Sequence, residues 1–313
     1  MDINILQGDC IESLKKLEDQ SINTCITSPP YWGLRNYNDE EKQLGMEDTP
    51  EEFVNNLVNV FREIKRVLRD DGTVWLNLGD SYSSGGRTTT TNQSLRGDKD
   101  YGVTRPKPSK GIKPKDLIGI PWRVAFALQQ DGWYLRQDII WHKPNPMPES
   151  VRDRCTKAHE YIFLLSKNVK YYYDHEAIKE DAKTPAVSRN KMGEGYQADY
   201  TKGKRFSDGE RVWGSTKKNK RSVWKVSTKP FKGAHFATFP KDLIEPCVLA
   251  GCPEGGTVLD PFGGSGTTGI VAAQHNRNAV LLELNQEYID LAKQRINKEL
   301  GMMANLKCEK EKI

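Results

Sequence analysis

The segment from Thr257 to Glu283 has a strand–loop–helix–strand pattern that few folds accommodate. An apolar run, TVLDPF, leads into GGSGTTG, where Gly264 to Gly269 match the pattern G-x-G-x-x-G. A helical segment follows, and the next apolar run, NAVLLE, ends on Glu283. Glycines at such a turn let the backbone approach a ligand closely, and the acid can bind ribose hydroxyls. The pattern therefore predicts an α/β protein with a nucleotide-type site, although a tight turn that binds nothing would give the same short motif.

Two features favour a ligand smaller than a dinucleotide. Asp260 and Phe262 precede the glycines and place a carboxylate and a ring beside the turn, which suits a cationic or amine-bearing ligand better than a pyrophosphate. About one further strand and helix follow the motif, so a second nucleotide-binding half would have to come from the N-terminal part of the chain. S-adenosylmethionine, an adenosine with an amino acid arm, fits these features. A nicotinamide-dependent dehydrogenase is the alternative that the glycine motif leaves open.

The N-terminal part alternates between expected strands and helices. INILQGD and NTCITS are typical of short strands, with a helical spacing of apolar residues between them. Residues 49–72 are the clearest helix, with Thr49 as N-cap, Pro50 in the first position and Gly72 as the stop. A strand at TVWLNLGD follows, and this alternation is typical of a parallel sheet. WYLRQDIIWHK and EYIFLLSK are expected to form a hairpin at a sheet edge.

A diproline ends the second expected strand. In TSPPYW, Pro29 and Pro30 cannot donate to a sheet ladder and fix their own φ angles, so the strand must stop there. The chain then presents Ser28, Tyr31 and Trp32 at the strand tip. A surface turn would explain this short stretch equally well on its own.

Positive charge is concentrated in two segments, although the whole chain carries only +5. Residues 83–115 hold eight Lys or Arg against two acids, and residues 180–232 hold fourteen against six. Aromatic residues are interleaved in the second segment, at Tyr196, Tyr200, Phe206, Trp213, Trp224 and Phe231. Two such segments favour a nucleic-acid partner over a merely solvated surface.

TSPPYW and DPFGGSGTT, in this order, resemble the β-group of DNA amino-methyltransferases, and further similar stretches extend the resemblance over nearly the whole chain. These stretches are GDCIESLKKL, GAHFATFPKDLIEP and LLELNQEYIDLAKQRI. The resemblance implies an α/β fold with a Rossmann-like, seven-stranded, mostly parallel sheet that has one antiparallel edge strand. The order is permuted: residues 1–179 form the catalytic half with a mobile basic loop at 83–115, residues 180–232 an inserted target recognition region, and residues 233–313 the cofactor half.

The resemblance also implies the roles of individual residues. Glu283 would bind the ribose of S-adenosylmethionine, Asp9 would approach its adenine, and Phe239 and Pro240 would cover its amino acid end. The cofactor-binding set is Asp9, Phe239, Pro240, Asp260, Phe262, Gly264, Gly266, Thr267 and Glu283. Ser28, Pro29, Pro30 and Tyr31 would form the catalytic motif.

The catalytic motif suits the chemistry of a base amine. The lone pair of an exocyclic amine is delocalised into the ring, so the nitrogen needs hydrogen-bond acceptors that draw it toward sp³ geometry. The Ser28 hydroxyl and the Pro29 carbonyl can be these acceptors, because the diproline fixes the carbonyl and leaves no nearby N–H to compete. Tyr31 offers a ring on which the base, once extruded from the duplex, can stack.

The resemblance implies the target base, whereas the DNA contacts are expected from the two basic segments and from the residues after the diproline. Serine in the first motif position favours cytosine N4, with adenine N6 as the alternative, and a DNA-binding module without catalysis is a third reading that the intact motifs disfavour. The expected contacts with double-stranded DNA are Trp32, Arg35, Lys107, Lys110, Lys113, Lys217, Lys218, Arg221 and Trp224. A cognate restriction endonuclease is a further candidate partner, and the protein is expected to be a monomer or homodimer.

The cysteines and the N-terminus carry less information. Six scattered cysteines include no CxxC pair, so no metal site is expected. Pro246-Cys247 resembles the nucleophilic pair of cytosine-C5 methyltransferases but lies far from the diproline, and Cys247 is expected to be a small buried residue. With no visible export signal and no long apolar run, a cytoplasmic protein of a prokaryote or phage, without membrane contact, is expected.

Overall fold

The computed structural model describes residues 1–33, 43–83, 112–182, 187–188, 212–213, 217–228 and 239–310. The chain divides into two compact units. The large unit comprises Met1–Tyr173 and Ser222–Ile313, and the small unit comprises Asp174–Arg221. Arg35, Lys107 and Lys110 lie outside the described residues, so their predicted contacts with DNA stay predictions.

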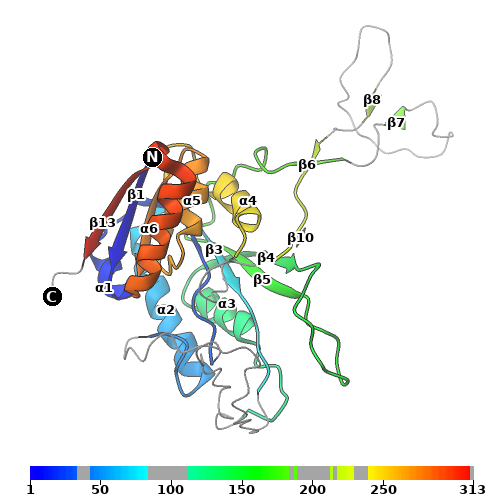
Figure 1. The fold of residues 1–313 in the computed structure, drawn as a ribbon. Helices are drawn as coiled ribbons and strands as arrows, with labels where there is room; N and C mark the ends of the chain where they lie inside the picture. The colour runs from blue at the N-terminus through cyan, green and yellow to red at the C-terminus, as the bar shows by residue number, and fades with distance from the viewer. Residues whose placement is uncertain are drawn as a thin grey trace. The chain divides into compact units, whose positions relative to one another are not determined.

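A nine-stranded sheet, formed by the described residues, is the centre of the large unit (Figure 1). Its order is β10 (Val223–Lys225), β4 (Tyr134–His142), β5 (His159–Ser166), β3 (Leu68–Leu78), β2 (Ile22–Thr27), β11 (Thr257–Asp260), β12 (Asn278–Glu283), β1 (Asp2–Gln7) and β13 (Asn305–Lys310). Every neighbouring pair is parallel except the two that involve β5. The predicted α/β class with a mostly parallel sheet is therefore confirmed.

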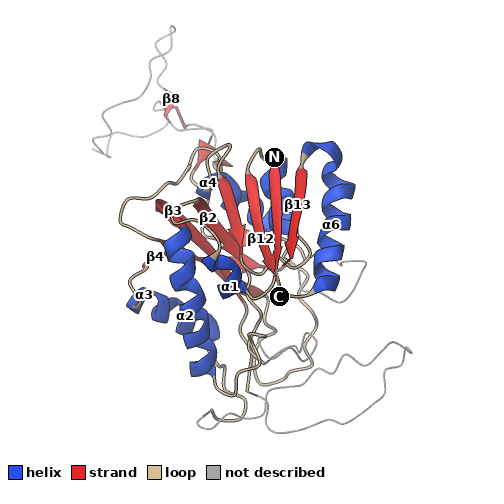
Figure 2. Cartoon of the chain, turned by 90° about the vertical axis from the view of Figure 1, so that its left-hand side faces the viewer, coloured by secondary structure: helices blue, strands red, loops and turns tan. Residues whose placement is uncertain are grey.

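Helices cover both faces of the sheet, as in doubly wound proteins (Figure 2). α1 (Cys10–Lys15), α2 (Pro50–Val67) and α3 (Ile120–Gln130) pack in sequence along one face. α4 (Lys241–Gly251), α5 (Thr267–Gln274) and α6 (Gln286–Leu300) pack along the other, and a short 3₁₀ helix at Gly301–Met303 leads into β13. No helix in the described ranges is long and apolar enough to cross a membrane.

The α2 helix shows how local sequence sets the boundaries of an element. Thr49 and Glu52 form a capping box in which each side chain accepts a hydrogen bond from the other's backbone N–H, both at 3.2 Å. Phe53, Leu57 and Phe61 recur at helical spacing and are fully buried against the core. The helix ends at Val67 rather than near Gly72, since β3 begins at once at Leu68 and includes that glycine.

Two details of the predicted sheet were wrong. The sheet has nine strands rather than seven, because β13 adds to the β1 edge and β10 adds to the β4 edge. The antiparallel strand β5 is also internal rather than at an edge. After α3 the chain forms β4, which does not pair with β3. The next strand, β5, lies between β4 and β3 and pairs antiparallel with both.

Trp224 belongs to the sheet rather than to a recognition surface. It lies on β10, is only 5% exposed and packs against Trp75, with ring centroids 6.3 Å apart. Next to it, the Trp141 indole donates a hydrogen bond to the Val226 carbonyl at 2.8 Å. The expectation that Trp224 contacts DNA is contradicted, because a buried ring has no face left for a base.

The small unit contains two short antiparallel strand pairs within the described residues. β6 (Glu180–Asp181) pairs with β9 (Lys217–Lys218), and β7 (Val187–Ser188) pairs with β8 (Val212–Trp213). The small unit begins at Asp174, before the predicted start at 180, and ends at Arg221, before the predicted end at 232. Its assignment as a target recognition region stays a proposal.

Candidate active site

The two sequence motifs meet at the carboxyl ends of the neighbouring strands β2 and β11. These strands are parallel, with Val258 opposite Thr24 and Leu259 opposite Cys25. From β11 the chain winds through α5 to β12 on one side, whereas from β2 it winds through α2 to β3 on the other. The order of the sheet therefore reverses between β2 and β11, and open α/β sheets bind ligands in the crevice at such a switch point.

Asp260 connects the two strand ends directly. Its carboxylate accepts hydrogen bonds from the Thr27 hydroxyl at 2.7 Å, the Thr268 hydroxyl at 2.6 Å and the Phe262 backbone N–H at 3.1 Å. The residue is 2% exposed, and burial raises the pKa of its carboxyl to about 6 although these three donors oppose the shift. Asp260 thus holds the strand that carries Ser28 against the loop that carries the glycines.

The glycine turn needs its glycines for conformation and for close packing. Gly264 and Gly266 have φ angles of 48° and 76°, in the left-handed region that other residues rarely adopt. A β-carbon on Gly266 would also lie 3.1 Å from that of Ala292. Arg295 supports the turn by donating to the Ser265 carbonyl at 2.7 Å and to the Thr267 hydroxyl at 3.1 Å.

Glu283 lies against this turn from the end of β12. One carboxylate oxygen accepts from the Gly264 N–H at 2.8 Å and the other from the Asn285 N–H at 2.9 Å. Burial raises the pKa of the Glu283 carboxyl to about 7 despite these donors. A half-buried carboxylate that is held beside a glycine turn can accept hydrogen bonds from ligand hydroxyls when it is ionised.

The other predicted cofactor residues lie at neighbouring positions. The Gly8 N–H donates to the Glu283 carbonyl at 3.0 Å, which places Asp9 next to the end of β12. Asp9 also caps α1 by accepting from the Ile11 N–H at 2.9 Å. Phe239 and Pro240 lead into α4 and are half-buried and buried, respectively. Their roles toward a ligand stay predictions.

The diproline tip has an available hydroxyl. Ser28 directly follows β2 and is half-buried, and no described residue hydrogen-bonds its side-chain oxygen. Pro29 is buried, so the backbone after Ser28 is packed in place. Trp32, in contrast, is 3% exposed and donates its indole N–H to the Glu47 carbonyl at 2.9 Å. The expectation that Trp32 contacts DNA is therefore contradicted, because its ring packs in the core.

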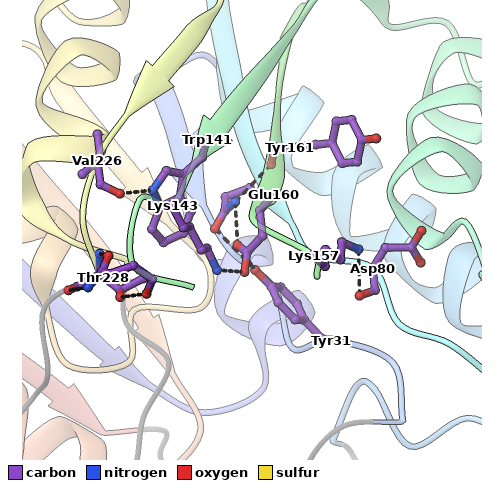
Figure 3. A network of polar contacts seen from close by, with 11 residues as sticks. Tyr31, Asp80, Trp141, Lys143, Lys157, Glu160, Tyr161, Val226 and Thr228 are labelled. Atoms are coloured by element: carbon purple, nitrogen blue, oxygen red, sulfur yellow. Dashed lines mark hydrogen bonds and ion pairs between the residues drawn. The ribbon is translucent and has the colours of Figure 1, made fainter. Parts of the chain in front are cut away.

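Sequence reasoning missed the residues that hold Tyr31 (Figure 3). The Tyr31 hydroxyl donates to Glu160 at 2.7 Å, and Glu160 also forms an ion pair with Lys143. The Asn77 side chain donates to Glu160 at 3.3 Å and to the Tyr161 carbonyl at 3.0 Å. The one signal in the sequence was the carboxylate at the start of an otherwise apolar strand, EYIFLLS.

The described cationic residues predicted to contact DNA are exposed or partly paired. Lys113 is exposed at the end of the first basic segment. In the small unit, Lys217 pairs with Asp181 at 2.8 Å, while Lys218 and Arg221 lie 4.0 and 3.6 Å from Glu180. Cys247 is buried in α4, as predicted.

The fold and this arrangement define a doubly wound α/β protein whose two motifs lie together at the switch point of the sheet. The model of the DNA methylase family, which covers N6 and N4 methyltransferases, matches residues 22–294, and the chain belongs to this family. The chain is 50% identical over 295 residues to the type II methyltransferase M.SmaI of Serratia marcescens, with 93% of this chain and 90% of that protein aligned. It is 49% identical to M.Cfr9I of Citrobacter freundii, with 94% and 88% aligned.

Two solved structures share the fold at lower identity. A DNA modification methylase from Thermus thermophilus, complexed with S-adenosyl-L-methionine, superposes with a TM-score of 0.62 at 21% identity and 99% coverage of both chains. The PvuII DNA methyltransferase, described as cytosine-N4-specific, superposes with a TM-score of 0.62 at 18% identity, covering 98% of this chain and 95% of that one. These likenesses confirm the predicted Rossmann-like fold.

Proposed function

We propose that this DNA methylase transfers a methyl group from S-adenosylmethionine to the exocyclic N4 of a cytosine that has left duplex DNA. The observation that carries the proposal is the Thr27–Asp260 hydrogen bond, which joins the Ser28 tip to the glycine turn. A base amine held at Ser28 would then lie beside a ligand held at the turn. The serine, together with the cytosine-N4-specific PvuII relative, favours cytosine, and adenine N6 is the second candidate.

The residues around the glycine turn fit this cofactor. Gly264 and Gly266 have positive φ angles and no side chains, so the cofactor can approach their backbone closely. Glu283 offers a carboxylate that can accept hydrogen bonds from the ribose hydroxyls. S-adenosylmethionine supplies an electrophilic methyl group when bound. The chain supplies the geometry: Ser28 and the Pro29 carbonyl accept hydrogen bonds from the amine and orient its lone pair, and Tyr31 stacks on the base.

The test is the identity of the methylated base. Plasmid DNA is incubated with the purified protein and S-adenosylmethionine, digested to nucleosides and analysed by mass spectrometry. N4-methylcytosine is the expected product. N6-methyladenine would overturn the choice of base and leave the methyltransferase proposal standing, whereas no methylated base on DNA of varied sequence would overturn the proposal itself.

Cofactor affinity is expected to rise with pH up to about 7 and to level off above it. Burial holds the Glu283 pKa at about 7 in the free protein, and ribose hydroxyls donating to the ionised carboxylate would lower that pKa on binding. Binding below about pH 7 should therefore release a proton and be weaker. Calorimetry across this range, in two buffers of different ionisation enthalpy, measures both effects.

The substitution Glu283→Gln should weaken cofactor binding and remove this pH dependence. Glu245→Gln on α4 is the control, because Glu245 pairs with His275 at 3.0 Å away from the glycine turn. A wild-type affinity that stays constant from roughly pH 6 to 8 would contradict the role of Glu283.

DNA binding is expected to weaken steeply with salt, because the two basic segments would neutralise backbone phosphates. The triple substitution of Lys107, Lys110 and Lys113 by alanine should make the log–log salt slope shallower by up to about 2.7, at about 0.9 per phosphate contact, without changing the methylated sequence. Substitutions of Lys217, Lys218 and Arg221 should change which sequence is methylated as well as how tightly DNA binds. Fluorescence anisotropy across a salt series, and sequencing of a methylated random pool, measure these two effects. If neither set of substitutions changed the affinity or the salt slope, both segments would be only solvated surface.

We further propose that the protein protects DNA against a restriction endonuclease that cuts the same sequence, since its relatives are named type II methyltransferases. Plasmid methylated by the protein should resist that nuclease and remain sensitive to others.

A further inference from the structure

The Tyr31 ring is held at its tip by a carboxylate from a distant strand. Its hydroxyl donates to Glu160 Oε2 at 2.7 Å, and Asn77 donates to the same oxygen at 3.3 Å. Lys143 pairs with the other oxygen, Oε1. The Glu160 side chain is only 14% exposed, so its position is fixed by neighbours rather than by solvent.

The ring is also held along its edge. An ideal β-carbon on Gly79 would lie 2.5 Å from Tyr31 Cε2, so the ring packs directly on this glycine. Gly79 follows β3, and Glu160 lies in β5, the strand that pairs with β3. Two paired strands therefore determine the orientation of a side chain that comes from the loop after β2.

Glu160 is itself held in place by Lys143, which lies over the Trp141 ring. Trp141 lies opposite Glu160 in the β4–β5 pair, and the Lys143 ammonium lies 4.3 Å from the centre of the Trp141 ring. The lysine is 19% exposed and keeps the partly buried carboxylate paired. Burying a carboxylate costs free energy unless it is paired and hydrogen-bonded. A glutamate at this position is therefore better explained by a specific role than by packing alone.

We propose that Glu160 is a positioning residue for methyl transfer, which orients the Tyr31 ring so that the extruded base can stack on it, and that Lys143 holds Glu160 in turn. The inference rests on the proposed function, in which Tyr31 receives the base. A stacking surface acts only when its plane is fixed within about 10–20°, and a side chain on a loop lacks that restraint unless its tip is anchored. Misplacing a reacting group by about 1 Å costs about 100-fold in rate.

Three variants test the proposal in the full-length protein. Glu160→Ala removes the nearer acceptor and leaves the Asn77 side-chain oxygen at 3.5 Å, Glu160→Gln retains an acceptor oxygen, and Tyr31→Phe removes the hydroxyl while keeping the ring. The matched control is Glu63→Ala, because Glu63 is a similarly half-buried carboxylate that pairs with Arg66 on α2. Single-turnover methyl transfer, cofactor affinity and the fluorescence of 2-aminopurine at the target position are measured for each.

Glu160→Ala is expected to slow methyl transfer by about 10–100-fold and to lower the 2-aminopurine signal, with cofactor affinity unchanged. Glu160→Gln should recover much of the loss, and Glu63→Ala should match the wild type. In the Tyr31→Phe background, Glu160→Ala should have little further effect, because the hydroxyl it anchors is gone. Additive losses, or a wild-type rate for Glu160→Ala, would overturn the positioning role. A wild type that neither extrudes the base nor transfers a methyl group would instead overturn the proposed function.

Discussion

Asp260→Ala is expected to lower the free energy of unfolding by about 2–4 kcal/mol and to abolish cofactor binding. The substitution removes the acceptor for two buried hydroxyls, those of Thr27 and Thr268, and each unsatisfied group costs about 1–3 kcal/mol. It also removes a carboxyl whose pKa is raised by burial, which offsets part of the loss at neutral pH. Chemical denaturation and calorimetry with S-adenosylmethionine measure the two effects.

Asp260→Asn separates the structural and electrostatic contributions of this residue. The folded-state pKa of about 6 lies above the ordinary value of 3.8, so the wild type loses stability as pH rises through this window. The asparagine variant has no such titration, so its stability relative to the wild type should improve as pH rises from about 4 to 6 and stay level above that. If it folds and binds the cofactor as tightly as the wild type, the carboxylate's charge has no role in binding.

The meeting of the two motifs could be predicted from the sequence. Each motif directly follows an apolar strand, and the carboxyl ends of parallel strands share one edge of the sheet. Asp260, Glu283 and the diproline therefore lie at the predicted end of the fold. The prediction needed only the strand directions and the alternation of strands with helices.

The errors came from features that depend on pairing over long distances. Trp224 stands among lysines in a polar segment, and only the pairing of β10 with β4 buries it. β13, NLKCEK, alternates exposed and half-buried residues, but only Leu306 and Cys308 are apolar, so the sequence marks this strand weakly. Glu160 contacts a residue 129 positions earlier in the chain, which no local pattern can indicate.

The burial of Trp32 also depends on tertiary packing and is not visible in the local sequence. Trp32 follows the catalytic motif and was expected at the DNA, but its ring packs in the core and its indole N–H bonds to the Glu47 carbonyl. An aromatic residue beside a functional motif has the same sequence appearance whether it binds a base or supports the loop. The neighbouring Tyr31 is half-buried and has its hydroxyl anchored, which leaves it the better candidate for stacking.

Ser28→Ala is expected to lower the rate of methyl transfer by about 100- to 1,000-fold while cofactor affinity and stability stay near wild type. The hydroxyl has no partner among the described residues, so its removal leaves no buried donor unsatisfied there. One preorganised hydrogen-bonding group in a reacting site contributes about 2.7–4 kcal/mol to the barrier, which gives this rate loss. Single-turnover methylation with saturating cofactor measures it.

The controls decide whether the hydroxyl or the local structure matters. Ser28→Thr keeps the acceptor oxygen and should retain much more activity than Ser28→Ala. Ser21→Ala removes a serine hydroxyl just before the same strand, where it donates to the Glu18 carbonyl at 2.7 Å, and should match the wild type. If Ser28→Ala transfers methyl groups at the wild-type rate, the amine is oriented without Ser28. The Pro29 carbonyl would then be the one acceptor that the diproline tip supplies, and the backbone alone would orient the amine at the strand end.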